Sequence, residues 1–132
     1  MANHIAHLPV PKNEPVLNYA PGSAERTALE AQLASMNAET IEIPLVIGGK
    51  EIRTGDMGEC RSPHNHEKVL ARYHKAGAAE VQLAADAAAK AWRDWSELGW
   101  EQRAAIFLKM ADLLAGPYRW LLNASTMLGQ SK

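Results

Sequence analysis

The sequence predicts an α/β fold in which an extended arm and a helix precede a β-hairpin, further strands and then three helices. Three patterns indicate this order. Residues 41–53, IEIPLVIGGKEIR, place two β-rich runs on either side of Gly48-Gly49, and paired glycines suit a tight hairpin because both adopt positive φ. Residues 68–74, KVLARYH, alternate between two faces as a strand does. From Ala78 onward the apolar period changes to that of a helix.

Length and composition describe an ordinary globular chain. Its 132 residues fit one domain, with 47% hydrophobic and 22% charged residues. The net charge of −1 gives no electrostatic basis for binding nucleic acid or an anionic membrane. A single cysteine excludes an internal disulfide and favours a reducing compartment. No apolar run approaches the roughly 20 residues that span a bilayer.

The start of the chain indicates its compartment. MANHIAHLPVPKNEP lacks the basic and apolar regions of a secretory signal. No arginine precedes Arg26, which argues against a mitochondrial transit peptide. We therefore expect a cytoplasmic location, or the mitochondrial matrix if the source is eukaryotic.

Residues 1–22 are predicted to form an extended N-terminal arm, separate from a partial domain at residues 23–132. Prolines exclude a regular helix in this arm; they are Pro9, Pro11, Pro15 and Pro21. Its apolar residues could dock it on another surface; they are Val16, Leu17 and Tyr19. Ser23 is placed as an N-cap, and the spacing of the following apolar residues predicts a helix over residues 24–37.

The middle of the chain predicts two more strands around the turn PHNH, residues 63–66. The first covers residues 59–62 and the second residues 68–74. Pro44 interrupts the run that leads into the hairpin. Because proline has no backbone N–H, we expect it at a strand start or a sheet edge.

The last part of the chain predicts three helices. The first covers residues 78–95, with an apolar stripe of Val81, Ala85, Ala88, Trp92 and Trp95. The second covers residues 100–115, with Ala104, Phe107, Ala111 and Leu114 on one face. Gly116 is placed to cap it, and Pro117 opens a third helix that runs to about residue 128 with Leu121, Leu122 and Ser125 directed inward.

One stretch, GECRSPHNHEKVLARYH, carries the residue types of a metal site. Cys60, His64, His66 and His74 have the spacing C-x3-H-x-H-x7-H. Structural zinc sites usually show two close ligand pairs, and this spacing lacks them. The tripeptide His64-Asn65-His66 occurs in nucleases, but no basic groove accompanies it. A turn around Pro63 accounts better for these residues, and we expect no metal site.

The remaining candidate residues also have structural interpretations. A reactive thiolate needs a helix N-terminus or a nearby cation, and Arg61 should point to the opposite face of the strand from Cys60. The acidic residues lie in a turn or on solvated helix faces; they are Asp56, Glu59, Asp86, Asp94 and Asp112. The tryptophans at helical spacing indicate core or interface positions; they are Trp92, Trp95 and Trp100. Gly48-Gly49 opens a hairpin, so the dinucleotide fingerprint is absent. We predict no catalytic and no cofactor-binding residue.

The order of these segments resembles the N-terminal segment of the aldehyde dehydrogenase superfamily. The resemblance rests on a hairpin with Gly-Gly-Lys, the turn SPHNHEKVLA, a helix ending in W-x-x-W, and EQR followed by FLKMADLL. NEPVLNYAPGSAER and AGPYRWLLNASTMLGQSK resemble the branch that oxidises L-glutamate γ-semialdehyde (1-pyrroline-5-carboxylate) to L-glutamate in proline breakdown. The resemblance covers nearly the whole chain, from about Asn13 to Lys132.

This resemblance implies an incomplete cofactor-binding domain of an NAD-dependent enzyme. It implies that the catalytic cysteine, the general-base glutamate, the oxyanion asparagine and the main NAD contacts belong to motifs downstream of Lys132. No functional residue is therefore carried over. The partners implied are the rest of the enzyme or another subunit, and an aldehyde substrate. We expect the isolated chain to be inactive and weakly folded, with exposed apolar surface.

Two alternatives remain open. The chain could be a stand-alone, noncatalytic interaction module derived from the same family, which a stop codon directly after codon 132 would favour. A metal-binding module is the other, and elemental analysis of the purified protein would test it.

Overall fold

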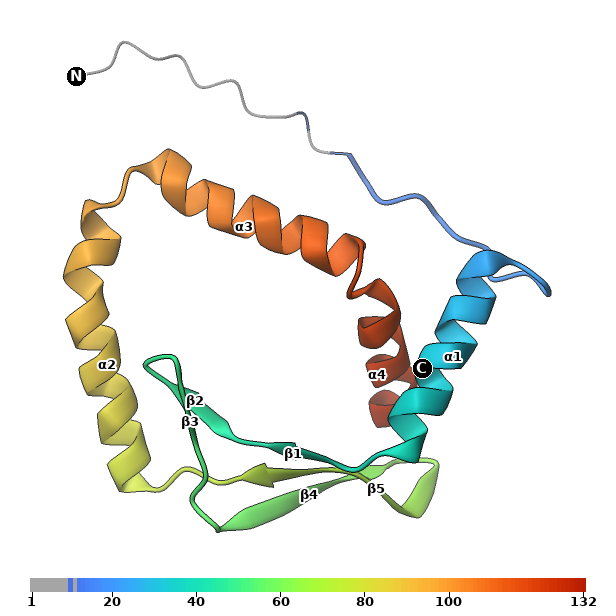
Figure 1. Ribbon diagram of the computed structural model, residues 1–132, viewed down its shortest axis with the longest axis horizontal. Helices are drawn as coiled ribbons and strands as arrows, with labels where there is room; N and C mark the ends of the chain where they lie inside the picture. Colours follow the sequence, from blue (N-terminus) through green and yellow to red (C-terminus); the bar gives the residue numbers. More distant parts are fainter. Residues whose placement is uncertain (1–9, 11) are drawn as a thin grey trace.

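A computed structural model describes residue 10 and residues 12–132, and within these residues the α/β prediction is confirmed. Figure 1 shows a small β-region at the base, α2 beside it, α3 across the top, and α4 returning to pack on α1. The elements are α1 (Ala24–Ala38), β1 (Ile41–Ile43), β2 (Leu45–Ile47), β3 (Lys50–Ile52), β4 (Met57–Ser62), β5 (Asn65–His74), α2 (Ala78–Glu97), α3 (Trp100–Ala115) and α4 (Arg119–Gln130).

The strands form two small sheets. β2 and β3 make the predicted hairpin, whose turn residues Gly48 and Gly49 have φ of 57° and 76°. β5 lies at the centre of the other sheet, antiparallel to β4 and parallel to β1. The run that leads into the hairpin contains Pro44, which lies directly before β2, at a strand start as the sequence predicted. Pro44 divides that run, and its first half joins β5 instead of the hairpin.

The turn between β4 and β5 is shorter than predicted. Only Pro63 and His64 lie in it, while Asn65 and His66 already belong to β5. The pairing shifts register around Arg61, which bends β4 near this turn. The predicted four-residue turn was therefore wrong by two residues.

The helices begin and end close to the predicted residues. The Ser23 side chain accepts a hydrogen bond from the Arg26 N–H at 3.3 Å, which confirms the N-cap of α1. α3 has the predicted bounds, and Gly116 follows it as the C-cap. α4 begins at Arg119, two residues after Pro117, because Pro117 and Tyr118 lie in the connecting turn.

The core is thin and lies between α4, α1 and the β4–β5 sheet. Among the described residues, Ala71 and Ala124 are the buried hydrophobic ones, at 5% and 0% exposure. Leu121, Leu122 and Ser125 were predicted to be directed inward, and none of the three is buried. Leu121 and Ser125 instead line a half-open cavity of about 400 Å³ together with α1 and the sheet. Ala124 is the buried side chain of α4.

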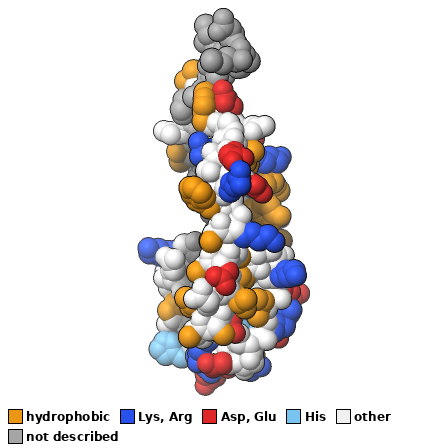
Figure 2. Space-filling view, turned by 90° about the vertical axis from the view of Figure 1, so that its left-hand side faces the viewer, with side chains coloured by type: hydrophobic (Ala, Val, Ile, Leu, Met, Phe, Trp, Pro, Cys, Tyr) orange, Lys and Arg blue, Asp and Glu red, His pale blue; other side chains and the backbone are white. Residues whose placement is uncertain are grey.

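α2 and α3 expose large apolar side chains. Trp92 is 68% exposed, Phe107 63% and Val81 61%. Trp92, Trp95 and Trp100 are therefore not core residues of this chain, and an interface position remains for them. Figure 2, which faces the side of the molecule on which α2 lies, shows hydrophobic side chains interspersed with charged ones.

The described part of the arm docks on α4. Arg119 pairs with Glu14 at 3.1 Å and donates to the Pro15 carbonyl at 3.5 Å. The Asn123 amide donates to the Tyr19 hydroxyl at 2.9 Å, and the Tyr19 ring meets Trp120 edge to face. Of the arm's three apolar docking candidates, Val16 is 99% exposed, so it does not dock. Residues 1–9 and 11 of the predicted arm lie outside the described residues.

Candidate functional site

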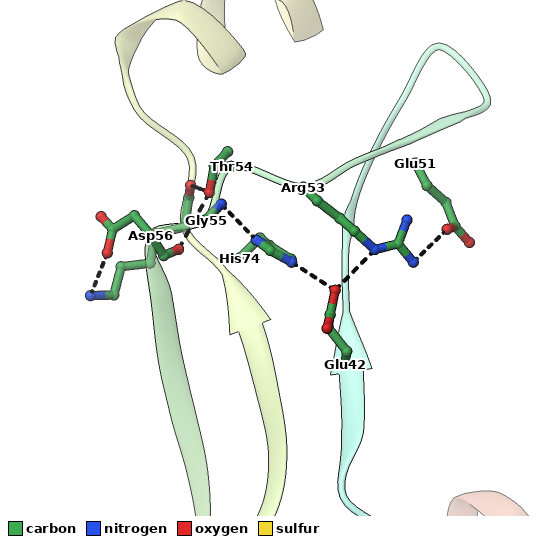
Figure 3. A network of polar contacts seen from close by, with 8 residues as sticks. Glu42, Glu51, Arg53, Thr54, Gly55, Asp56 and His74 are labelled. Atoms are coloured by element: carbon green, nitrogen blue, oxygen red, sulfur yellow. Dashed lines mark hydrogen bonds and ion pairs between the residues drawn. The ribbon is translucent and has the colours of Figure 1, made fainter.

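A polar network joins the ends of β1 and β5 to the segment after the hairpin (Figure 3). Glu42 Oε1 accepts from His74 Nε2 at 3.0 Å and from Arg53 Nε at 2.9 Å. The other side of Arg53 pairs with Glu51 at 3.0 Å. Within the described residues this network is the one that brings a buried imidazole, a carboxylate and a guanidinium together.

Both ring nitrogens of His74 are engaged in hydrogen bonds. Its side chain is only 4% exposed, and its Nδ1 lies 3.1 Å from the Gly55 N–H. An N–H group can only donate, so Nδ1 must accept and the ring proton must lie on Nε2, facing Glu42. Because both ring nitrogens are engaged, His74 has no nitrogen left for a substrate. The network therefore joins β1 and β5 to the segment after the hairpin.

The charges around Glu42 favour its ionised form. The hydrogen bond from His74 and then that from Arg53 lower the pKa of the Glu42 carboxyl. The Glu42 carboxylate correspondingly raises the pKa of the Arg53 guanidinium, with Glu51 adding to the effect. Both side chains are about half exposed, so solvent screens these ion pairs and their contribution to stability is small.

The segment after the hairpin is fixed by a second set of contacts. Thr54 Oγ1 donates to the Lys75 carbonyl at 3.0 Å, and Lys75 Nζ lies 3.3 Å from Asp56 Oδ1. These contacts hold the Gly55 N–H against His74, as Figure 3 shows. They place Asp56 in the connection between β3 and β4, where the sequence predicted a turn, whereas the same prediction for Glu59 was wrong because Glu59 lies in β4.

The four zinc-ligand candidates do not come together. His74 lies at the end of β5, whereas His64 lies in the turn at the opposite end of that strand. His66 Nε2 donates to the Pro63 carbonyl at 3.1 Å, and Cys60 is exposed within β4. In the part of the chain that the structure describes, no three His, Cys, Asp or Glu side chains are grouped to hold a metal ion.

A serine–histidine cluster occurs at the turn but lacks the parts of a hydrolase site. His64 Nδ1 lies 2.8 Å from Ser131 Oγ and 3.3 Å from Ser62 Oγ, beside a cavity of about 440 Å³. Ser62 Oγ also lies 3.4 Å from His64 Nε2, so hydroxyls face both ring nitrogens, and no hydrogen bond from a carboxylate orients the ring among the described residues. Ser131 has φ of 55° because it caps α4, where left-handed residues are ordinary.

Cys60 has no activating cation among its described neighbours. Arg61 donates instead to the His66 carbonyl at 2.9 Å and pairs with Glu59. The thiol lies at the rim of the cavity of about 400 Å³ between α1, α4 and the sheet. These contacts give Cys60 a structural position, and nothing in them lowers the barrier to nucleophilic attack.

The described residues do not fit the pyrophosphate of a dinucleotide. That group binds where a strand passes through a glycine-rich turn into a helix N-terminus. The connection of this kind in the described chain leads from β5 into α2, and there the Glu80 carboxylate accepts from the Gly77 N–H at 2.8 Å. A carboxylate already occupies the helix N-terminus and would repel a phosphate.

Sequence reasoning missed the Glu42–His74–Arg53 network. Glu42 and His74 are 32 positions apart, and their contact depends on the parallel pairing of β1 with β5. No local sequence pattern indicates the pairing of β1 with β5, because β1 has only three residues and all are exposed. The one available signal was His74, a polar residue at the end of the predicted strand over residues 68–74.

Comparisons with known proteins agree on one family. A model of the aldehyde dehydrogenase family matches residues 52–127. The mitochondrial delta-1-pyrroline-5-carboxylate dehydrogenase of Dictyostelium discoideum is 46% identical over 127 residues, which are 96% of this chain and 23% of that protein. The human mitochondrial enzyme of the same name is 40% identical over 129 residues, 98% of this chain and 23% of its own length.

Solved structures give the same result. The delta-pyrroline-5-carboxylate dehydrogenase of Mycobacterium tuberculosis, bound with NAD, has a TM-score of 0.93 and 45% sequence identity over 98% of this chain and 24% of the solved chain. The observed α/β arrangement thus matches an N-terminal part of an aldehyde dehydrogenase domain. The chain spans about a quarter of the length of the relatives it matches. None of the helices in residues 12–132 is both long and apolar enough to cross a membrane.

Proposed function

The chain belongs to the aldehyde dehydrogenase family, and from that premise we propose that it is a scaffold segment of an NAD-dependent L-glutamate γ-semialdehyde dehydrogenase. Such an enzyme oxidises its aldehyde, formed from 1-pyrroline-5-carboxylate in proline catabolism, to L-glutamate. The observation that carries this proposal is the similarity to the Dictyostelium enzyme over nearly the whole of this chain.

In this proposal the chain supplies structure and other polypeptide supplies the chemistry. Residues 23–132 form part of the NAD-binding domain, and residues 12–22 of the N-terminal arm pack on it. The closed N-terminus of α2 and the engaged ring of His74 are consistent with a segment that holds neither cofactor nor substrate. The nucleophile, the general base and the NAD contacts then lie outside these 132 residues. The compartment is the cytoplasm, or the mitochondrial matrix as in the named eukaryotic relatives.

A chimera tests this function. The 132 residues replace the matching quarter of the Mycobacterium tuberculosis enzyme, and NADH formation from L-glutamate γ-semialdehyde is followed by absorbance. We expect the chimera to reduce NAD at a rate within about tenfold of the parent enzyme, because the catalytic groups are unchanged. The isolated chain, assayed alongside, is expected to form no NADH.

Two results would contradict the proposal. Turnover by the isolated chain would place catalytic groups within these residues. A chimera that folds with the sedimentation behaviour of its parent but forms no NADH would show that the segment does not serve this reaction. A second chimera, carrying the same region of the human enzyme, controls for the exchange itself.

The second candidate is a noncatalytic interaction module. The observation that favours it is the exposure of Trp92, Phe107 and Val81 on the surface of α2 and α3. Such a module would bind a full-length relative in trans. Mixing the chain with an intact relative and measuring their association by sedimentation distinguishes the two candidates, since a segment whose place is already filled has no surface to bind.

A further inference from the structure

The N-terminal arm lines one side of a cavity of about 500 Å³ at the corner between α3 and α4. Four charged residues line this cavity: Lys12 and Glu14 come from the arm, Asp112 from the last turn of α3, and Arg119 from the first turn of α4. Figure 1 shows the described arm, in blue, passing this corner on the side away from the β2–β3 hairpin. We call this space the arm cavity. Because part of its wall is the arm, a ligand held there would touch both the arm and the helices.

Two of the charges, those of Arg119 and Glu14, neutralise each other. Arg119 Nη2 lies 3.1 Å from Glu14 Oε2 and donates to the Pro15 carbonyl at 3.5 Å. The guanidinium also lies 5.9 Å from the centre of the Trp120 ring, and the Arg119 side chain is only 19% exposed. Because these contacts fix the guanidinium, this ion pair is a rigid part of the cavity wall.

The other two charges are those of Lys12 and Asp112, and none of the ion pairs among the described residues includes either side chain. Lys12 is a cation on the arm and Asp112 an anion on α3, and both line the same cavity. With two positive and two negative groups, the charged lining is neutral in total. It therefore favours a ligand that carries one charge of each sign over an ion that carries a single charge.

The rest of the lining is apolar apart from Asn123, whose amide already donates to Tyr19. The apolar residues are Ala111, Leu114, Ala115 and Leu122. Leu114 and Leu122 are 37% and 43% exposed, so apolar surface remains for a ligand to cover. The volume lies within the range of small-molecule sites, about 300–1,000 Å³. A small branched hydrocarbon side chain therefore suits this part of the cavity.

We propose that the arm cavity binds a neutral, zwitterionic α-amino acid with a small apolar side chain. Its carboxylate lies against Lys12 and its ammonium group against Asp112, while its side chain covers the two leucines. A simple anion or a simple cation of the same size would leave one of these two charged residues without a partner. This inference goes beyond the proposed function, which gives the arm no role except packing.

Ligand binding also holds the arm in place. The ligand joins Lys12 on the arm to Asp112 on α3, whereas the arm by itself contacts α4. An arm that opens must first release the ligand, so the opening of the arm is suppressed in proportion to ligand occupancy. The amino acid thereby fixes the arm on both helices, and the protection of the arm reports the binding.

Limited proteolysis of the chain with chymotrypsin tests the proposal, with L-valine as the ligand. Chymotrypsin cleaves after Leu17 and Tyr19 in the arm. For a ligand of about eight non-hydrogen atoms we expect a Kd on the order of 1 mM. At an L-valine concentration of about ten times Kd, cleavage in the arm should slow about tenfold. Cleavage at the exposed Trp92 of α2, measured in the same digest, should change less than about twofold.

Two analogues separate the charges of the ligand. Isovalerate keeps the carboxylate and the branched side chain of valine but lacks the ammonium group, and isobutylamine lacks the carboxylate. Each analogue makes only one of the two ionic contacts. Because one exposed ionic contact is worth about threefold in affinity, each should bind at least about threefold more weakly than L-valine.

Variants of the chain assign each contact. Asp112→Asn should weaken L-valine binding about threefold and leave isovalerate binding unchanged, because isovalerate has no ammonium group. Lys12→Gln should weaken L-valine binding by the same factor and leave isobutylamine binding unchanged. Glu101→Gln removes a carboxylate at the other end of α3 and should alter none of these affinities. The same comparison in the chimera described above covers the case in which the isolated chain is too weakly folded for the digest.

Three outcomes would overturn the proposal. The first is the absence of any effect of L-valine on cleavage of the arm. The second is equal affinity for L-valine, isovalerate and isobutylamine, because the cavity would then select no zwitterion. The third is protection in the isolated chain that is absent from the chimera, because the remaining polypeptide would then fill the cavity. Protection of the arm by L-valine in a chimera that forms no NADH would support this site and reject only the proposed function.

Discussion

Replacing Gly58 by alanine should destabilise the β4–β5 sheet through one contact. A methyl group built on Gly58 would lie 2.8 Å from Tyr73 Cε1 and closer still to the end of the same ring. Gly58 and Tyr73 are directly paired across the two strands, so the ring lies over the glycine. The alanine methyl therefore cannot enter unless the tyrosine ring leaves.

The structure gives the size of the effect. Tyr73 is 38% exposed, and a ring that swings out would expose on the order of 100 Å² more, about 2.5 kcal/mol at 25 cal/mol per Å². Removing a glycine from a strand returns about 0.5 kcal/mol, because the unfolded chain loses conformational freedom. We expect a net loss of about 2 kcal/mol in the free energy of unfolding.

Urea unfolding followed by circular dichroism measures this loss, with two matched controls. Gly129→Ala makes the same substitution in open space within α4 and should be neutral or slightly stabilising. In a Tyr73→Ala background, Gly58→Ala should cost nothing, because the ring is gone. If Gly58→Ala were equally costly with and without the tyrosine ring, the steric account would be refuted.

Three further predictions concern the polar contacts. Glu42→Gln should remove part of the acid dependence of stability, because the folded state lowers the pKa of Glu42. The contribution of Glu42 to the free energy of unfolding is present above the unfolded pKa of about 4.3. It is lost as pH falls through the folded pKa. The difference in urea midpoint between wild type and Glu42→Gln should become smaller as pH falls. His74→Ala should speed hydrogen exchange of the Gly55 amide about tenfold, because that N–H loses its acceptor. Arg119→Ala should speed proteolysis within residues 12–20 about tenfold, since the arm loses both contacts with this side chain.

Each of these variants has a control within the chain. Glu67→Gln removes an exposed carboxylate outside the network, and its urea midpoint at neutral pH should match that of wild type. His66→Ala removes an imidazole that contacts only its own turn, and exchange at Gly55 should not respond. Arg26→Ala breaks an exposed pair within α1 and should leave the arm protected. If a control gave the same result as the variant with which it is paired, the contact assigned as the cause would be rejected.

Local sequence signals predicted most of the fold because they are encoded by neighbouring residues. Ser23 caps α1, Gly48-Gly49 turns the hairpin and Gly116 ends α3, and each acts within a few positions. The parallel pairing of β1 with β5 was missed because it joins segments some 30 positions apart across Pro44. Periodicity identified the stripe on α2 but could not say that a different face meets the hairpin.

In the candidate site, too, local features could be predicted from the sequence and tertiary contacts could not. The separation of Cys60, His64, His66 and His74 depends on β5 being a long strand that keeps its two ends apart. The network around His74 required tertiary pairing, which a single sequence does not display. The arrangement of Gly77 and Glu80 was readable, since a glutamate three residues into a helix commonly reaches back to its start.

Pro44 has a consequence for how α2 is positioned. Pro44 is the single residue between β1 and β2. Its restricted backbone therefore sets the angle at which the β2–β3 hairpin projects from the other sheet. The tip of that projection is what approaches Ala87. The distance between α2 and the sheet is therefore set by the rigid backbone of Pro44 and by the short hairpin that extends from it.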